Sequence, residues 1–148
     1  MCLWSSSPIL TNVTFTDNTA STIENYVIAK GGGMSLIYGS NPTLMNVIFS
    51  NNSAATSNSV PADGGGMSLH SNCNPSLTNV IFSGNSANDG GGMSLHNQSS
   101  QNILGPSPTL TNVTFSSNIA TNDGGGILLH DSTLKMWNSI IWDNIPAI

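Results

Sequence analysis

The sequence contains very little charge. Only 6% of its 148 residues are charged, arginine is absent, and the two cationic residues are the isolated Lys30 and Lys135. With a formal net charge of −5, the chain lacks the basic clusters that binding to nucleic acid or to an anionic membrane surface requires. Asparagine, serine, threonine and glycine supply the polarity instead, which favours a folded chain over a charged disordered tail.

Long hydrophobic runs and cysteine motifs are also missing. A transmembrane helix needs about 20 consecutive apolar residues, and no such stretch exists, so we expect no membrane span. The opening MCLWSSSPIL lacks the basic and apolar regions of a signal peptide, and we expect the chain to be a segment of a larger protein. Cys2 and Cys73 form no CxxC motif, so free thiols are favoured, although a disulfide between them stays open.

What the sequence does contain is an internal repeat of two motifs. The first motif, P-x-L-x-N-V, begins at Pro8, Pro42, Pro75 and Pro108. It leads into F-x-x-N, with phenylalanines at Phe15, Phe49, Phe82 and Phe115, and a degenerate copy, NSIIWDN, places Ile141 and Asn144 at the same positions. The second motif is a glycine triplet that begins at Gly31, Gly64, Gly90 and Gly124. A constant core with insertions of variable length is typical of a solenoid.

Within each unit the hydrophobic period is two, which indicates short strands. Met67 and Leu69 flank Ser68, and Val80 and Phe82 flank Ile81. We therefore predict an all-β parallel β-helix of about five rungs, each with three short strands: one after the glycines, one around P-x-L and one through V-x-F. The chain is then a single domain, 1–148, with rungs at approximately 1–30, 31–63, 64–89, 90–123 and 124–148.

The paired motifs GGGMSL and PTLTNVxFSxNSA resemble a known family over essentially the whole chain. They are similar to the GG-box and FxxN repeats of the chlamydial polymorphic outer-membrane proteins, and to right-handed parallel β-helix repeats in many large bacterial surface proteins. Methionine or isoleucine directly after three glycines departs from the chlamydial box and favours the broader family. The resemblance implies a right-handed coil in an exported, extracellular or cell-surface (outer-membrane) protein with an adhesive function.

The glycine triplets and the aspartates before them have structural explanations and weaker functional ones. A strand pattern follows each triplet, where a phosphate loop would continue with Lys-Ser/Thr or a helix, so we interpret the glycines as corners of the coil. Asp63, Asp89 and Asp123 each precede a triplet and favour turns, with Lys30 at the equivalent place one rung earlier. We predict no cofactor, but clustered carboxylates leave weak calcium binding open.

Three histidines fall at one position of successive rungs. His70, His96 and His130 each lie six residues after the first glycine of their triplet, and we predict a stack on the surface of the coil. Imidazoles at strand spacing, with Asp131 nearby, leave a transition-metal site as the alternative. Two asparagine columns, one in P-x-L-x-N-V and one in F-x-x-N, are predicted to form turns and amide ladders.

One outward column is apolar and marks a candidate interface. Ile48, Ile81 and Ile140 stand between inward positions and should face solvent, which indicates a binding surface as well as ordinary β-propensity. The inserted loops STIENYVIA (21–29) and NQSSQNILGPS (97–107) are the predicted recognition elements, because insertions carry function on rigid scaffolds.

These features favour a non-catalytic structural and adhesive module. Its predicted partners are a host-cell surface, through a protein or glycan ligand, or other copies through uncapped coil ends. The alternative is a fragment of a carbohydrate-active β-helix enzyme, either a polysaccharide lyase or a glycoside hydrolase. We expect no catalysis from these residues, because arginine is absent and a uniform aspartate column lacks the contrasting environments of an acid and a base.

Overall fold

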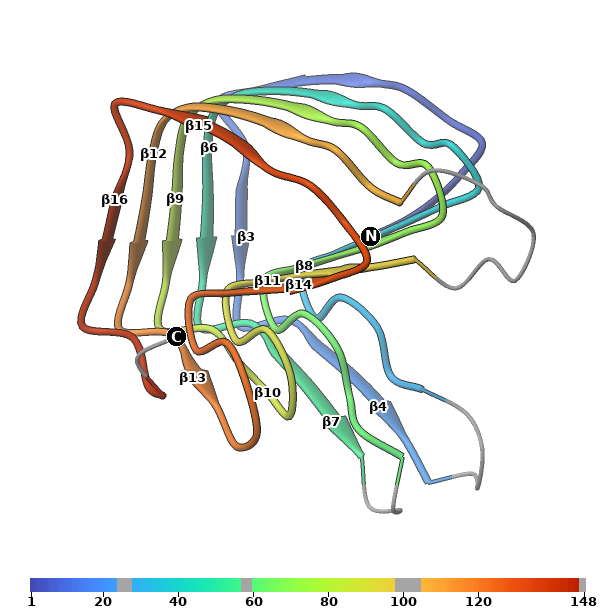
Figure 1. Cartoon of the computed structure of the whole chain (residues 1–148), viewed down its shortest axis with the longest axis vertical. Coiled ribbons are helices and arrows are strands. Elements are labelled where there is room, and N and C mark those ends of the chain that lie inside the picture. Colours follow the sequence, from blue (N-terminus) through green and yellow to red (C-terminus); the bar gives the residue numbers. More distant parts are fainter. Residues whose placement is uncertain (24–27, 57–59, 98–104, 147–148) are drawn as a thin grey trace.

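The chain winds into a solenoid of parallel strands (Figure 1). The computed structural model describes residues 1–23, 28–56, 60–97 and 105–146, and these ranges contain β-strands and no helix. It follows that they include no helix long and apolar enough to cross a membrane. The predicted all-β parallel β-helix is confirmed.

Three sheets make up the coil. Sheet A contains β1 (Cys2–Trp4), β5 (Met34–Ile37), β8 (Met67–His70), β11 (Met93–His96) and β14 (Ile127–His130). Sheet B contains β2 (Ile9–Thr11) and β3 (Thr14–Thr16), then β6 (Thr43–Ser50), β9 (Ser76–Ser83) and β12 (Thr109–Ser116), and finally β15 (Lys135–Trp137) and β16 (Ile140–Trp142). Sheet C contains β4 (Thr19–Thr22), β7 (Ser53–Thr56), β10 (Ser86–Ala87) and β13 (Ile119–Ala120).

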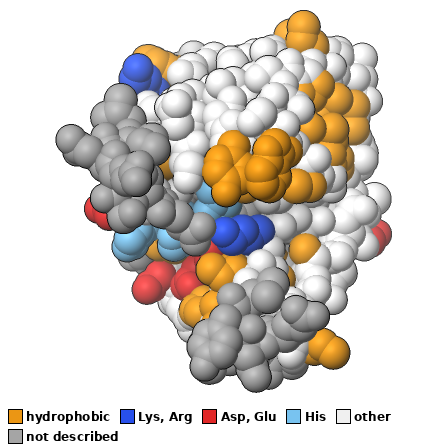
Figure 2. Space-filling model, turned by 90° about the vertical axis from the view of Figure 1, so that its right-hand side faces the viewer, with side chains coloured by type: hydrophobic (Ala, Val, Ile, Leu, Met, Phe, Trp, Pro, Cys, Tyr) orange, Lys and Arg blue, Asp and Glu red, His pale blue; other side chains and the backbone are white. Residues whose placement is uncertain are grey.

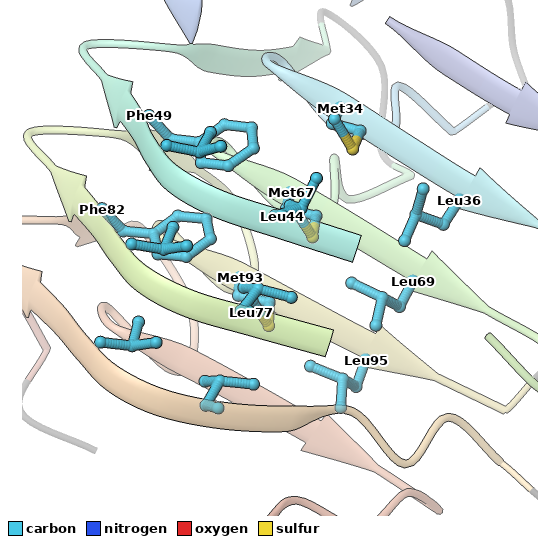
Figure 3. Packing of buried hydrophobic residues seen from close by; sticks show 14 of the residues in the cluster. Met34, Leu36, Leu44, Phe49, Met67, Leu69, Leu77, Phe82, Met93 and Leu95 are labelled. Carbon is cyan, nitrogen blue, oxygen red and sulfur yellow. The ribbon is translucent and has the colours of Figure 1, made fainter. Parts of the chain in front are cut away.

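The core lies between sheets A and B and is built from columns of identical side chains. Met67 pairs with Met93 and Leu69 with Leu95 in register along sheet A, and these side chains point inward toward sheet B (Figure 3). The phenylalanines at Phe15, Phe49, Phe82 and Phe115 stack with ring centroids 4.9, 4.8 and 4.7 Å apart. Because each rung covers the next, no rung could bury its apolar side chains alone.

The two predicted strands of P-x-L and V-x-F join into one long strand of sheet B. In β6, Asn46 has a φ of 54°, so the alternation shifts by one residue, and Leu44 and Val47 are both fully buried. Figure 3 shows the ribbon of β6 curving between Leu44 and Phe49. Asparagine tolerates this left-handed conformation, which explains why it recurs at Asn12, Asn79, Asn112 and Asn138.

Sheet C was not predicted, and it changes the count of rungs. It follows F-x-x-N, where two to four residues such as Ser53–Thr56 are too short for a visible period. Figure 1 shows its strands projecting from one corner of the coil. Sheet A has five strands, whereas sheet C has four, so the prediction of five rungs with three strands each was slightly too high.

The second asparagine of the repeat forms a buried ladder at the corner beyond sheet B. Asn85 donates from Nδ2 to Asn118 Oδ1 at 2.9 Å and to the carbonyl oxygen of Phe49 at 3.0 Å, and its Oδ1 accepts from Asn52 Nδ2 at 2.9 Å. The degenerate final copy follows the same pattern, because Asn118 donates to Asn144 Oδ1 and Phe115 pairs in register with Ile141.

The glycine triplets form the corner that leads into sheet A, as predicted. Gly64 has a φ of +67°, which L side chains rarely adopt. At Gly65 the neighbouring rung approaches so closely that an added Cβ would lie 2.5 Å from the carbonyl oxygen of Gly91. The first position therefore needs conformational freedom, and the second needs the absence of a side chain.

The isoleucine column is exposed as predicted, and the cysteines are free thiols, as the sequence favoured. Ile48, Ile81 and Ile140 are 38%, 41% and 58% exposed on the outer face of sheet B. Cys2 is exposed, Cys73 is buried, and both are free thiols. The predicted recognition loops lie partly outside the described residues, at 24–27 and 98–104.

Candidate functional site

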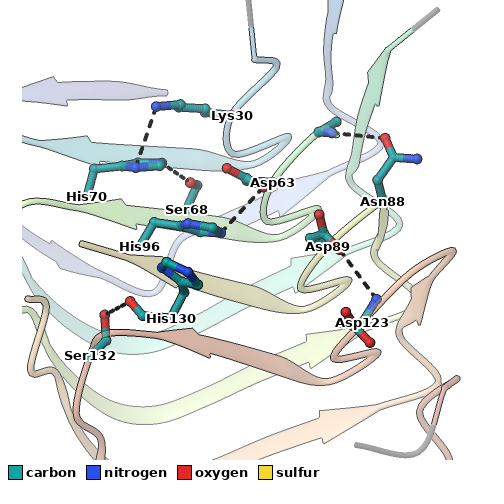
Figure 4. A network of polar contacts seen from close by, with 11 residues as sticks. Lys30, Asp63, Ser68, His70, Asn88, Asp89, His96, Asp123, His130 and Ser132 are labelled. Atoms are coloured by element: carbon teal, nitrogen blue, oxygen red, sulfur yellow. Dashed lines mark hydrogen bonds and ion pairs between the residues drawn. The ribbon is translucent and has the colours of Figure 1, made fainter. Parts of the chain in front are cut away.

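Charged and imidazole side chains gather along the outer face of sheet A. We call this group the outer-face cluster and define it as Lys30, Asp63, Ser68, His70, Asp89, Ser94, His96, Asp123 and His130. Figure 2 shows histidine, lysine and acidic side chains side by side on this face of the molecule. Figure 4 shows that the histidines come from three successive strands and the aspartates from the corners beside them.

Part of the cluster is far more buried than the sequence predicts. Alternation in β8 turns Ser68 and His70 away from the core, as expected, yet they are 0% and 2% exposed. Ser94, predicted to face solvent, is also 0% exposed. After β4 and β7 the chain returns beside this face of sheet A (Figure 1), where Lys30 contacts His70 and Asp63 contacts His96. Side chains of the returning segments, such as Lys30, then lie against it. The predicted surface stack is therefore wrong for His70.

His70 is held as a neutral imidazole by its two neighbours. Lys30 Nζ lies 3.5 Å from His70 Nδ1, and Ser68 Oγ lies 2.7 Å from His70 Nε2. An ammonium group can only donate, so Nδ1 accepts and Nε2 carries the proton that it donates to Ser68. Burial, followed by the charges of Lys30 and His96, lowers the pKa of His70 to about 3.

Asp63 is the most buried carboxylate of the cluster. It is 3% exposed, and burial, followed by repulsion from Asp89, raises its pKa to about 6, against the opposing effects of Lys30 and His130. Its Oδ1 lies 3.7 Å from His96 Nε2. Burial also lowers the pKa of His96, which favours the neutral imidazole and weakens any charge attraction across this contact. Desolvation likewise lowers the pKa of Lys30, with Asp63 opposing it.

The aspartate column is not uniform, which corrects an assumption of the sequence-based argument. Asp63 is buried, Asp89 is half-buried and Asp123 is exposed. Asp89 Oδ1 accepts a 3.4 Å hydrogen bond from the backbone N–H of Asp123, so this contact joins two successive rungs rather than closing a local turn. The three carboxylates therefore differ in environment because rungs in the middle of the coil are covered and the last described rung is not.

The predicted metal alternatives are not supported by the geometry. The imidazole rings stack with centroids 5.9 Å apart for His70–His96 and 5.1 Å apart for His96–His130, with nearly parallel planes. Stacked rings direct their nitrogens alongside one another, whereas a metal needs ligands that converge. Within the described ranges, no three His, Cys, Asp or Glu side chains are arranged to hold a metal ion. His130 instead lies beside Asp131, with 3.9 Å between Nδ1 and Oδ2.

The serine–histidine contact is also unsuited to nucleophilic catalysis. A serine nucleophile needs an imidazole lone pair facing its hydroxyl, but His70 Nε2 donates to Ser68, and both residues are buried. One rung along, Ser94 Oγ and His96 Nε2 are buried and have no hydrogen-bond partner among the residues that the structure describes. Repetition of Ser-x-His could have suggested the contact from the sequence, but not its burial, because alternation alone places both side chains on the outer face.

Comparison with known proteins gives one clear result. The family model described as "Right handed beta helix region" matches residues 1–148, which is the whole chain. Searches of curated proteins and of solved structures give no match. The match agrees with the parallel strand order and the stacked columns described above, and it gives the hand that the motifs implied. The chain therefore belongs to the right-handed β-helix family.

Proposed function

We propose that the chain is a non-catalytic structural and adhesive segment of an exported bacterial surface protein. The observation that carries this proposal is the unbroken register of its rungs. The buried asparagine ladder runs from Asn18 to Asn144, and the phenylalanine stack runs beside it. Continuous hydrogen-bonded and packed columns resist bending, which suits a stalk that holds a binding surface away from its anchor.

The outer face of sheet B is the proposed adhesive surface. Ile48 and Ile81 pair in register and are both more than one-third exposed, with Met45 also 38% exposed on the same strand as Ile48. Apolar side chains in register on one face of a sheet fit a protein or glycan ligand that offers a complementary apolar face. The resemblance of the repeat motifs to those of chlamydial polymorphic outer-membrane proteins supports the same proposal, and with it we propose an extracellular or outer-membrane location.

Adhesion can be tested with beads that carry the purified chain. We expect wild-type beads to bind host cells, and the double variant Ile48→Lys/Ile81→Lys to lose most of that binding. The matched control Ile23→Lys changes an isoleucine that is 85% exposed outside this column. Equal binding by wild type and the double variant would contradict the proposed surface. Labelling of intact producing cells with antibody against the chain would test the location.

One observation favours a carbohydrate-active enzyme as the second candidate. Asp63 has a raised pKa of about 6 and is next to the more exposed Asp89, and two carboxylates in different environments can divide acid and base roles. A polysaccharide panel, assayed with and without calcium, separates the two candidates. Turnover that Asp63→Asn and Asp89→Asn abolish would overturn the non-catalytic proposal, whereas we expect no turnover.

A further inference from the structure

The outer face of sheet B carries no charge in the middle of the coil. The central strands β6, β9 and β12 have the sequences TLMNVIFS, SLTNVIFS and TLTNVTFS, none of which contains a charged residue, although the chain has a formal net charge of −5. Figure 1 shows these strands side by side along one side of the coil. Leucine, valine and phenylalanine are buried, so the side chains on the outer face are isoleucine, methionine, asparagine, serine and threonine.

An exposed asparagine ladder runs along the middle of this face. Asn112 donates from Nδ2 to Asn79 Oδ1 at 3.1 Å, and Asn79 donates to Asn46 Oδ1 at 3.2 Å. A primary amide has two N–H donors and two acceptor lone pairs, so Asn79 has a second donor and a second lone pair for a partner. The serine and threonine hydroxyls beside the ladder can also both donate and accept. A face with such polar groups can pair with a copy of itself.

The spacing of the rungs also favours a second copy as the partner. Ile48 pairs in register with Ile81, and Thr78 with Thr111, so equivalent groups recur at the strand spacing of about 4.8 Å. A partner matches several rungs at once only if its own groups recur at the same distance, and another copy meets this condition at every rung. A charged partner would instead lose hydration on this uncharged face without compensation.

We propose that the outer face of sheet B binds the same face of a second copy, with the two coils side by side and antiparallel. This inference rests on the proposed adhesive function and names the partner of that surface. A two-fold axis along β9 places β9 on β9 and β6 on β12. Ile81 then meets Ile81 of the second copy, Asn79 meets Asn79, and Ile48 meets Thr114. Antiparallel coils suit copies that are displayed on two facing cells.

The size of the face indicates a weak association between single copies. Sheet B has five rungs, and its central strands have 8 residues, which gives a face of about 26 by 24 Å. Two copies together would bury roughly 1,200 Å², at the low end of specific protein–protein interfaces. Many copies on one cell surface would act together and strengthen the contact between cells.

Sedimentation velocity of the purified chain at increasing concentration tests this pairing. We expect wild type to shift from monomer to dimer and no further, because a two-fold interface is closed. Ile81→Lys and Ile81→Asp each bring like charges together at the axis, so each variant alone should associate about ten-fold or more weakly than wild type. A mixture of the two variants should restore the dimer, because opposite charges then face one another.

Two further variants keep the test independent of folding. Ile81→Thr introduces the residue type that β12 has at the paired position, so it should fold normally and dimerise more weakly. The matched control Ile23→Lys changes an isoleucine that is 85% exposed outside this face and should dimerise like wild type.

Monomeric wild type at every concentration, a mixture that stays monomeric, or dimers that both charged variants keep would overturn the inference. Host-cell binding by a chain that stays monomeric would also overturn it, and would leave the proposed function intact. Dimers without host-cell binding would contradict host-cell adhesion and leave the self-pairing of sheet B intact.

Discussion

The buried amide ladder makes a sharp prediction about stability. Asn85→Asp keeps the shape of the side chain and its acceptor for Asn52, but it removes the Nδ2 group that donates to Phe49 O and Asn118 Oδ1 at 3.0 and 2.9 Å. Loss of a donor to a buried acceptor costs about 1–3 kcal/mol. Two such losses give about 2–6 kcal/mol, before the cost of burying a carboxylate at a fully buried position is added.

Urea denaturation followed by circular dichroism measures this loss of unfolding free energy. The control is Asn79→Asp in the exposed ladder, where Nδ2 donates to Asn46 Oδ1 at 3.2 Å and the φ of 55° suits aspartate. We expect the control to lose less than about 1 kcal/mol, because solvent replaces the missing contact. The difference should shrink at pH 3, where a protonated aspartate can donate again. Equal losses in the two variants would refute a stabilising role for the buried ladder.

Three further predictions concern the corners, the outer-face cluster and the thiols. Gly91→Ala should prevent folding or cost more than about 3 kcal/mol, because its Cβ would lie 2.6 Å from a carbonyl oxygen of the next rung. Gly39 has a φ of +72°, and a Cβ added there would meet no atom of the described residues within 4 Å other than those of its chain neighbours. Gly39→Ala should therefore lower the free energy of unfolding, measured by thermal denaturation, by only about 1–2 kcal/mol. The folded-state pKa of His70 is about 3, below the ordinary 6.5, so the unfolded chain binds the proton first. Wild type should therefore lose about 4–5 kcal/mol relative to His70→Asn as the pH falls from 6.5 to 3, and parallel stability curves would contradict this. A thiol reagent should label Cys2 rapidly in the folded chain and Cys73 only after denaturation, because burial hides Cys73 and raises its pKa. Fast labelling of both thiols would place Cys73 outside the core.

Much of the coil could be predicted because the same residue types recur at the same positions of each repeat. Alternation in MSL and VIF gives the inward positions of Met67, Leu69, Val80 and Phe82, and all four are fully buried. The glycine triplets give the corners, because few other residues allow a positive φ beside a close backbone. The P-x-L and V-x-F segments were separated in the prediction, since nothing local shows that Asn46 joins them into one bent strand.

For the outer-face cluster, the sequence predicts which residues stack in register from rung to rung, but not how deeply they are buried. His70, His96 and His130 are in register as the spacing predicts, but their burial is not a property of the spacing. Sheet C strands of two to four residues carry too few side chains for a period to appear. The sequence therefore did not predict sheet C, nor the contacts that Lys30 and Asp63 make on the outer face of sheet A. The exposed column through Ile48 and Ile81 was predictable because alternation alone decides which face a strand residue occupies.

The sequence by itself determined the period, the parallel stacking and the identity of each column, because every rung repeats the same side chains at the same positions. Tertiary structure decided the protonation and the accessibility of the polar groups. Lys30 and Asp63 reach His70 and His96 only because the chain returns from sheet C across the outer face of sheet A. Solvation depends on what lies above a side chain, and in a solenoid that neighbour comes from another rung or another sheet.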